Sequence, residues 1–217
     1  MFLIKSGEKE NLLQLQNDGR IYMKSLSYFE QCEDLSRKDD LEKASFVINN
    51  PPEPYYLKIK RDNVEGDHLT FKINKSITKG YEGYIFCMHC IMMDDSEEEK
   101  SFQLSTKDDH ILIINGNQFL NVIEQKLLKD KINHNKGLVI YKDFTNYVGR
   151  KNPFEKDLKF KGEHEFRLFI PMKENKEFHD FYIGALNEFS ALENVSPNHS
   201  FKIQREIPTH TTKIKYI

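Results

Sequence analysis

The chain has 217 residues, of which 32 are lysine or arginine and 34 are aspartate or glutamate, so its formal net charge is −2. The chain therefore lacks the basic excess that is typical of a non-specific nucleic-acid binder. Any nucleic-acid contact would have to be local. No apolar run approaches the ~20 residues of a membrane span, and no stretch resembles a secretory leader. We therefore expect a cytoplasmic protein of one folded domain, without a membrane partner.

The N-terminal part of the chain predicts a strand, a helix and a second strand in succession. Phe2–Ile4 is typical of a short strand, and Ser6 is a suitable N-cap for a helix that ends at Gly19. Alternating apolar and polar residues predict the next strand over Arg20–Met23. Residues 31–44 carry many charges and no apolar period, so we expect a loop with a helical turn there.

The middle of the chain predicts a hairpin and a buried strand. Three prolines at 51, 52 and 54 interrupt the chain, and Tyr56–Lys60 and His68–Ile73 then alternate on either side of a turn-forming segment. Tyr84–Met93 is the most apolar run, which favours a central strand buried on both faces. The acidic tract Asp94–Glu99 is interpreted as a loop.

The C-terminal half predicts one clear helix among several strands. Phe119, Ile123 and Leu127 recur at helical spacing, and Asn117 is the expected N-cap of that helix. The elements expected around it are strands at His110–Ile114, Gly137–Phe144, Phe181–Leu186, Phe201–Ile207 and Thr212–Tyr216, and a short helix at Glu188–Asn194. The whole chain, 1–217, is therefore expected to form a single α+β domain with a twisted, mainly antiparallel sheet.

The stretch from Pro153 to Pro171 carries the most pointed pattern of charge. Residues alternate from Gly162 onward, so a strand would place Glu163, Glu165 and Arg167 on one face, roughly 6.5–7 Å apart from neighbour to neighbour. Arg167 would then bias the ionisation of Glu165, and we take these three residues as the candidate catalytic group. The alternative is a solvated face with cross-strand ion pairs.

Two further groups of residues are candidate sites. Cys87 and Cys90 have the spacing of a metal or redox motif, but no second pair of ligands accompanies them, so we expect packing and no metal. Arg37, Asp39 and Glu42 lie in the expected loop, and loops carried on a sheet often supply binding residues.

Several of these pieces occur together in a known pattern. The chain reads Gly19-Arg20-x-Tyr22, Tyr28-Phe29, Arg37-x-Asp39-x-x-Glu42, Phe86-Cys87, and Pro153-Phe154-x-Lys156 followed by Phe160 and Glu163-x-Glu165-x-Arg167. In this it resembles an uncharacterised family of small bacterial and phage-associated proteins. The resemblance gives a family and no activity. Our own expectation is an effector of bacterium and phage conflict, with ligand-binding candidates Lys156, Arg20, Tyr22, Arg37, Asp39 and Glu42.

A more distant resemblance is to ADP-ribosyltransferases, which carry an early basic residue, a Ser-Thr-Ser strand and a Glu/Gln-x-Glu pair. The corresponding residues here are Lys5 or Arg20, Ser105-Thr106, and Glu163-x-Glu165, although Lys107 replaces the last serine. The resemblance implies NAD as substrate, with Glu165 on the nicotinamide ribose.

Two hypotheses follow. The first is an effector that binds a nucleotide-like ligand in a polar cleft and transfers from NAD. The second is a non-catalytic interaction protein, a sensor or inhibitor with a protein partner, in which the same charges are structural.

Overall fold

The structure is a computed structural model that describes residues 1–31, 38–60, 68–94, 99–104, 108–171, 178–196, 199–205 and 212–216. It confirms the predicted α+β class with mainly antiparallel strands. No helix in these ranges is long and apolar enough to cross a membrane. The helices are α1 (Lys9–Asp18), α2 (Leu26–Gln31) and α3 (Gly116–Lys129), with 3-10 turns η1 (Leu158–Glu163) and η2 (Asn187–Phe189).

The largest sheet has eight strands in the order β10-β14-β7-β1-β9-β16, with β2 pairing both β7 and β15. Every pair in it is antiparallel. Its strands are β1 (Phe2–Ser6), β2 (Arg20–Ser25), β7 (Gly83–Ile91), β9 (His110–Asn115), β10 (Asn135–Leu138), β14 (Glu165–Pro171), β15 (Phe178–Tyr182) and β16 (Ser190–Asn194).

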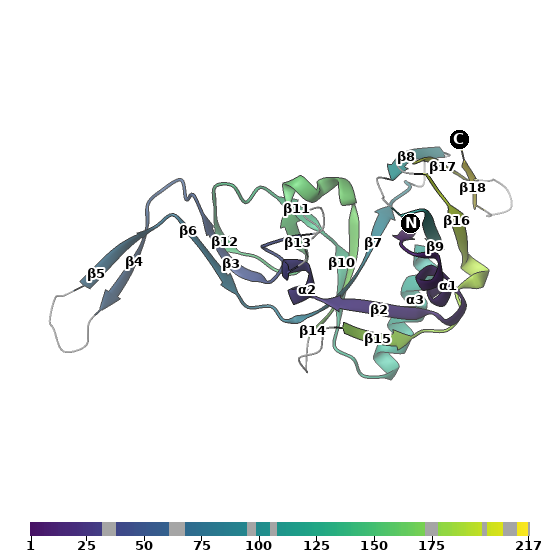
Figure 1. The fold of residues 1–217 in the computed structure, drawn as a ribbon, viewed down its shortest axis with the longest axis horizontal. Coiled ribbons are helices and arrows are strands. Elements are labelled where there is room, and N and C mark those ends of the chain that lie inside the picture. The colour runs from purple at the N-terminus through teal and green to yellow at the C-terminus, as the bar shows by residue number, and fades with distance from the viewer. Residues whose placement is uncertain are drawn as a thin grey trace.

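Smaller sheets flank the large one (Figure 1). The hairpin of β4 and β5 extends away from the body of the molecule, beyond the sheet formed by β12, β3 and β6 (Figure 1). These sheets are β12-β3-β6 (Tyr147–Arg150, Ala44–Asn49, Lys75–Lys79), β4-β5 (Tyr55–Lys60, His68–Ile73), β18-β17-β8 (Thr212–Tyr216, His199–Arg205, Glu99–Leu104) and β11-β13 (Ile140–Lys142, Glu155–Asp157), the last pair being parallel.

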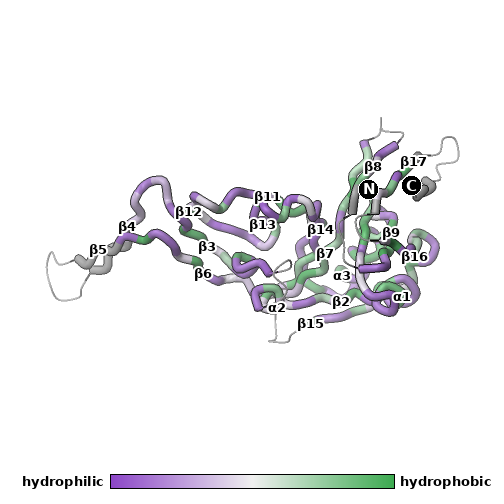
Figure 2. The backbone as a smooth tube through the Cα atoms, turned by 45° about the horizontal axis from the view of Figure 1, so that its top comes forward, coloured by the Kyte–Doolittle hydropathy of each residue, from purple (hydrophilic) through white to green (hydrophobic). Residues whose placement is uncertain are grey.

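The core forms on both faces of the large sheet, as the apolar run at 84–93 predicted. Phe86 of β7 packs in one buried cluster with Phe119 and Ile123 of α3, whereas its neighbour Ile85 packs in another with Leu26. Hydrophobic positions concentrate where β7, β9 and α3 meet (Figure 2). Successive residues of one strand thus point to opposite clusters, which fixes which side chains of β7 can reach a cleft.

The sheet divides along one edge of β7. Its other edge pairs with the whole length of β14, from Glu165 opposite His89 to Pro171 opposite Gly83. On the dividing edge, β2 pairs with β7 only at Tyr84 and Ile85, and β1 pairs only from His89 onward. The two strands diverge between these contacts and leave residues 86–88 facing an opening, which we call the fork.

Some predicted element boundaries are wrong. The α3 helix is capped by Asn115, whose side chain accepts from the backbone N–H groups of Asn117 and Gln118, rather than by Asn117. The N-cap of α1 is Glu8, not Ser6, although its left-handed C-cap at Gly19 is confirmed. The predicted helix at 188–194 is mostly strand β16, because pairing with β9 overrides local propensity.

Candidate functional site

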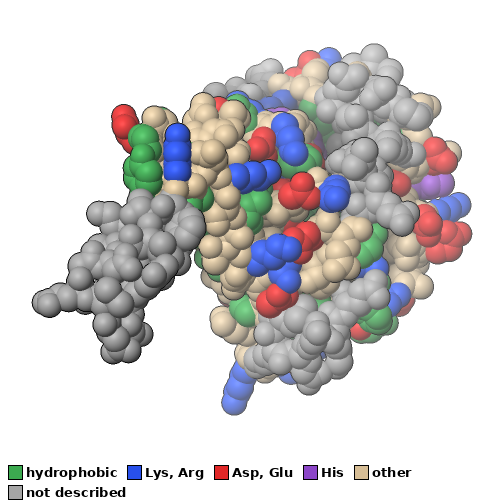
Figure 3. Space-filling model, turned by 60° about the vertical axis from the view of Figure 1, so that its left-hand side comes forward, with side chains coloured by type: hydrophobic (Ala, Val, Ile, Leu, Met, Phe, Trp, Pro, Cys, Tyr) green, Lys and Arg blue, Asp and Glu red, His purple; other side chains and the backbone are tan. Residues whose placement is uncertain are grey.

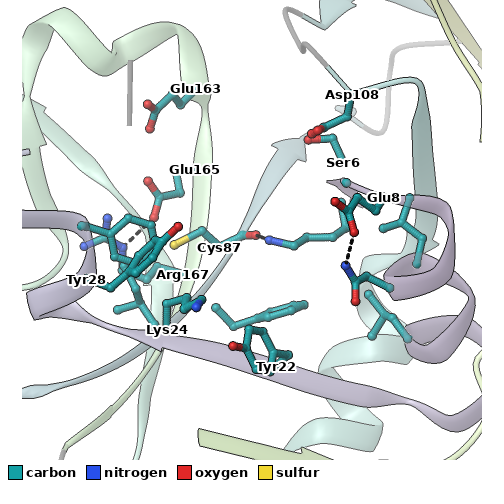
Figure 4. Close-up of a pocket in the computed structure, with 18 of the residues that line it drawn as sticks. Ser6, Glu8, Tyr22, Lys24, Tyr28, Cys87, Asp108, Glu163, Glu165 and Arg167 are labelled. Atoms are coloured by element: carbon teal, nitrogen blue, oxygen red, sulfur yellow. Dashed lines mark hydrogen bonds and ion pairs between the residues drawn. The ribbon is translucent and has the colours of Figure 1, made fainter. Parts of the chain in front are cut away.

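A pocket of about 480 Å³ opens at the fork, within the usual size range of small-molecule sites. Its lining includes Glu163 and Glu165 on one side and Tyr22 and Lys24 on the other. Cys87 of β7 lies between these two sides (Figure 4). Segments far apart in sequence therefore converge on one cavity because β1 and β2 separate along β7.

Arg167 anchors the first side of the pocket from within the protein. It is 1% exposed, and its Nε donates to Glu165 Oε1 at 2.6 Å. Its Nη1 donates to the carboxylate of Glu42 and to the carbonyl of Pro153. The guanidinium thus ties together β14, the turn before β3 and the segment before β13, and the solvated-face alternative is wrong for Arg167 and Glu165.

Lys156 connects the two candidate carboxylates. Its Nζ lies 2.6 Å from Glu163 Oε2 and 3.3 Å from Glu165 Oε2. The parallel pairing of β13 with β11 places Lys156 opposite Tyr141, whose hydroxyl accepts from the backbone N–H of Glu165 at 2.9 Å. Both oxygens of Glu165 are consequently held by cations, Oε1 by Arg167 and Oε2 by Lys156.

The predicted strand from Gly162 onward is wrong at its start. Residues 158–163 form η1, and His164 has a left-handed φ of 43°, so the strand begins only at Glu165. The side chain of Glu163 is 39% exposed, whereas that of Glu165 is 6% exposed. The two carboxylates therefore differ in access to a ligand, although they share Lys156.

Their pKa values also move in opposite directions. Burial would raise the pKa of Glu165, but the charges of Arg167 and Lys156 outweigh it and hold that pKa well below its usual range. Burial raises the pKa of Glu163, and Lys156 offsets this only in part. Burial also raises the pKa of the Cys87 thiol, so Cys87 is protonated at neutral pH.

A second layer of buried charge lies behind Arg167. Asp39 is 2% exposed and its Oδ1 accepts from the backbone N–H of Leu41, while its Oδ2 has no hydrogen-bond partner in the described structure. Burial and the nearby Glu42 raise the pKa of Asp39 to about 6. Burial lowers the pKa of Lys151, which is 1% exposed. Asp39 is therefore placed to support the site and not to line the pocket.

The β2 side of the pocket is more open. Tyr22 is 38% exposed, and the Arg20 guanidinium carbon lies 5.3 Å from the centre of its ring. Arg20 itself donates from Nη2 to Asp180 at 3.0 Å and from Nη1 to Gln14 at 2.7 Å. Lys24 Nζ lies 4.4 Å from the ring centre of Tyr28. This side presents aromatic rings with cations against them.

The structure brings most of the predicted site residues together. Glu42, Lys156, Glu163, Glu165 and Arg167 form one contact network that borders the pocket, and Asp39 lies behind it. Arg20 and Tyr22 line the other side. Arg37 and Ser105–Lys107 lie outside the described residues. Lys24 was not predicted, although its alternation with Arg20 and Tyr22 could have indicated it.

Lys5 lies at the base of the fork and lines the pocket. Its Nζ donates to the Cys87 carbonyl at 2.8 Å and lies 4.9 Å from the ring centre of Phe86. Cys90 packs in the core instead of facing the pocket. Among the described residues, no three His, Cys, Asp or Glu side chains are arranged to hold a metal ion.

Basic and acidic side chains are interspersed on the face shown in Figure 3, so the surface around them does not form a patch of one sign. Comparison with protein-family models, curated proteins and solved structures finds no match for this chain.

Proposed function

We propose that the fork pocket binds a nucleotide-like ligand and that the chain transfers the ADP-ribosyl group of NAD, as a cytoplasmic effector in bacterium and phage conflict. The main support is that the cavity carries an accessible carboxylate on one side and an aromatic ring with cations on the other. Glu163 offers an accessible carboxylate, while Tyr22, Lys24 and Lys5 offer a ring and two cations. A base, a phosphate and a ribose each find complementary chemistry there.

The transfer step needs a negative charge beside the ribose. The bond between C1′ and the nicotinamide nitrogen breaks, its electron pair leaves with neutral nicotinamide, and the ribose carries positive charge. An acceptor atom then attacks C1′ with its own electron pair and loses a proton. A fixed carboxylate stabilises the developing cation.

Glu163 suits the contact with the ribose better than Glu165 does, although the resemblance implied Glu165 for this role. Both oxygens of Glu165 are held by Arg167 and Lys156, and its side chain is nearly inaccessible. Glu163 has one carboxylate oxygen on Lys156 and a side chain that is more than one third exposed. We therefore assign the ribose contact to Glu163 and the positioning of Lys156 to Glu165.

A panel of NAD, ADP-ribose, ATP and adenosine in a thermal-shift assay tests binding, because a ligand of the folded state raises its apparent stability. Release of nicotinamide from NAD, measured by chromatography, tests transfer, with water as the basal acceptor. Glu163→Gln should fold normally and lose release by a factor on the order of a hundred.

Glu99→Gln is the matched control. Glu99 is 40% exposed and its carboxylate lies 2.5 Å from Lys202, so the charge and the lysine contact are the same but the pocket is not involved. It should release nicotinamide at the wild-type rate. If no member of the panel raises the melting temperature, the proposed function is wrong.

The second candidate is the non-catalytic interaction protein with a protein partner. It is supported by the burial of Arg167 and Glu165, whose ion pairs connect distant segments without a ligand. This candidate predicts that no nucleotide raises the melting temperature, and that the Glu163→Gln variant has the same effect in cells as the wild-type protein.

A further inference from the structure

The outer face of β2 and β15 forms a grid of aromatic and charged side chains that extends beyond the pocket. The register places Lys24 opposite Phe178, Tyr22 opposite Asp180, and Arg20 opposite Tyr182. The alternate residues Ile21, Met23 and Phe181 are buried in the core. The six residues of the three facing pairs therefore share the face that is turned away from the core.

The rings of this face are exposed to solvent. The exposed fraction is 38% for Tyr22, 43% for Phe178 and 54% for Tyr182. The rings of Tyr22 and Phe178 have centres 5.3 Å apart with an angle of 33° between their planes. Large rings that are left exposed on neighbouring strands commonly mark a binding surface.

Cations lie against these rings. The Arg20 guanidinium carbon is 5.3 Å and Lys24 Nζ is 5.4 Å from the centre of the Tyr22 ring. Exposed rings flanked by arginine and lysine are the combination that binds the bases and the backbone of a single strand, since every base has a flat face that can stack. Protein interfaces are also enriched in tyrosine, phenylalanine and arginine, so a requirement for bases is what distinguishes a nucleic-acid strand from a protein partner.

We propose that this face, comprising Arg20, Tyr22, Lys24, Phe178, Asp180 and Tyr182, is a stacking platform for the bases of a single-stranded nucleic acid. Tyr22 and Lys24 also line the fork, so the strand would run from the platform to the mouth of the pocket. Arg20 is already paired with Asp180, so stacking contributes more of the affinity than phosphate contacts do. The platform lies outside the carboxylate network and does not depend on transfer from NAD.

The test is fluorescence anisotropy with labelled oligothymidylate and oligouridylate of about a dozen nucleotides, which is within the usual site size. The expected Kd of the full chain is on the order of 1 to 100 µM at physiological salt. Phe178→Ala and Tyr182→Ala should each raise the Kd about fivefold or more. Binding of either strand supports the platform, and a preference between them reports the sugar and the thymine methyl group together.

Two controls decide between stacking and charge. Tyr56→Ala removes a ring that is 53% exposed on the distant β4–β5 hairpin, and it should leave the Kd unchanged. A strand of the same length without bases should bind at least fivefold more weakly. The platform is refuted if neither labelled strand binds, if the base-free strand binds equally well, or if the platform variants match Tyr56→Ala while their circular dichroism shows an intact fold.

Discussion

The two sides of the fork use similar residue types in opposite ways. On the β14 side, Arg167 and Glu165 are buried and satisfy one another. On the β2 side, Arg20 makes a comparable pair with Asp180, yet the two side chains are 28% and 32% exposed. Ion pairs that are buried leave an uncompensated charge when one partner is removed, whereas exposed pairs contribute little. The difference assigns stability to the β14 side and leaves the β2 side available for binding.

The largest expected effect comes from breaking the buried side. Arg167→Met should lower the free energy of unfolding by about 3–5 kcal/mol, because it removes the cation paired with the buried Glu42 and leaves the buried Glu165 with Lys156 alone. Arg20→Met is the matched change on the exposed side and should cost no more than about 1 kcal/mol. Urea unfolding of both variants measures the difference. Equal costs would remove the distinction between the two sides.

A smaller effect of opposite sign is expected at Asp39. Its pKa is raised to about 6 from 3.8, so the folded state binds this proton more tightly than the unfolded chain does. Ionisation of Asp39 therefore destabilises the fold; the penalty is fully present above about pH 6 and disappears as the pH falls below 3.8. Asp39→Asn removes this charge and should stabilise the protein at neutral pH by up to about 3 kcal/mol.

Measurement of unfolding at pH 7.5 and pH 5 checks the sign. The advantage of Asp39→Asn over the wild-type protein should be large at the higher pH and should shrink at the lower one. A loss of stability at pH 7.5 would show that Asp39 is needed as an anion, for example by Lys151.

Local pattern predicted the elements of this site but not its burial. Alternation correctly put Glu165 and Arg167 on one strand, because side-chain direction depends only on local backbone geometry. The partner Glu42 lies 125 residues away, and the second acceptor is a backbone carbonyl, so charges that end up in the core look like those of a solvated strand. The fork could not be predicted either, because it depends on how β1 and β2 share one edge of β7.

Where local and long-range preferences agreed, prediction succeeded. The apolar spacing of α3 was sufficient because its buried residues Phe119, Ile123 and Leu127 fall on one side of any regular helix. At 188–194 they disagreed: Leu192 pairs across from Leu112, and the sheet determined the outcome.

The smallest expected effect is that of Glu163→Gln, which is compared with the same change at Glu165, the other glutamate that contacts Lys156. Glu165→Gln should cost about 3–5 kcal/mol, since it removes a buried partner of Arg167. Glu163→Gln should cost no more than about 1 kcal/mol, because the side chain is 39% exposed and solvent screens its contact with Lys156. Glu99→Gln, with an equivalent lysine contact at the surface, gives the scale for that comparison.

If Glu163→Gln is as destabilising as Glu165→Gln, Glu163 belongs to the structural network and is not free to meet a ribose. If Glu163→Gln costs as little stability as Glu99→Gln and nicotinamide release is nevertheless lost, the charge of Glu163 acts on the ligand and not on the fold. Glu165 would then stabilise the structure, and Glu163 would contact the ligand.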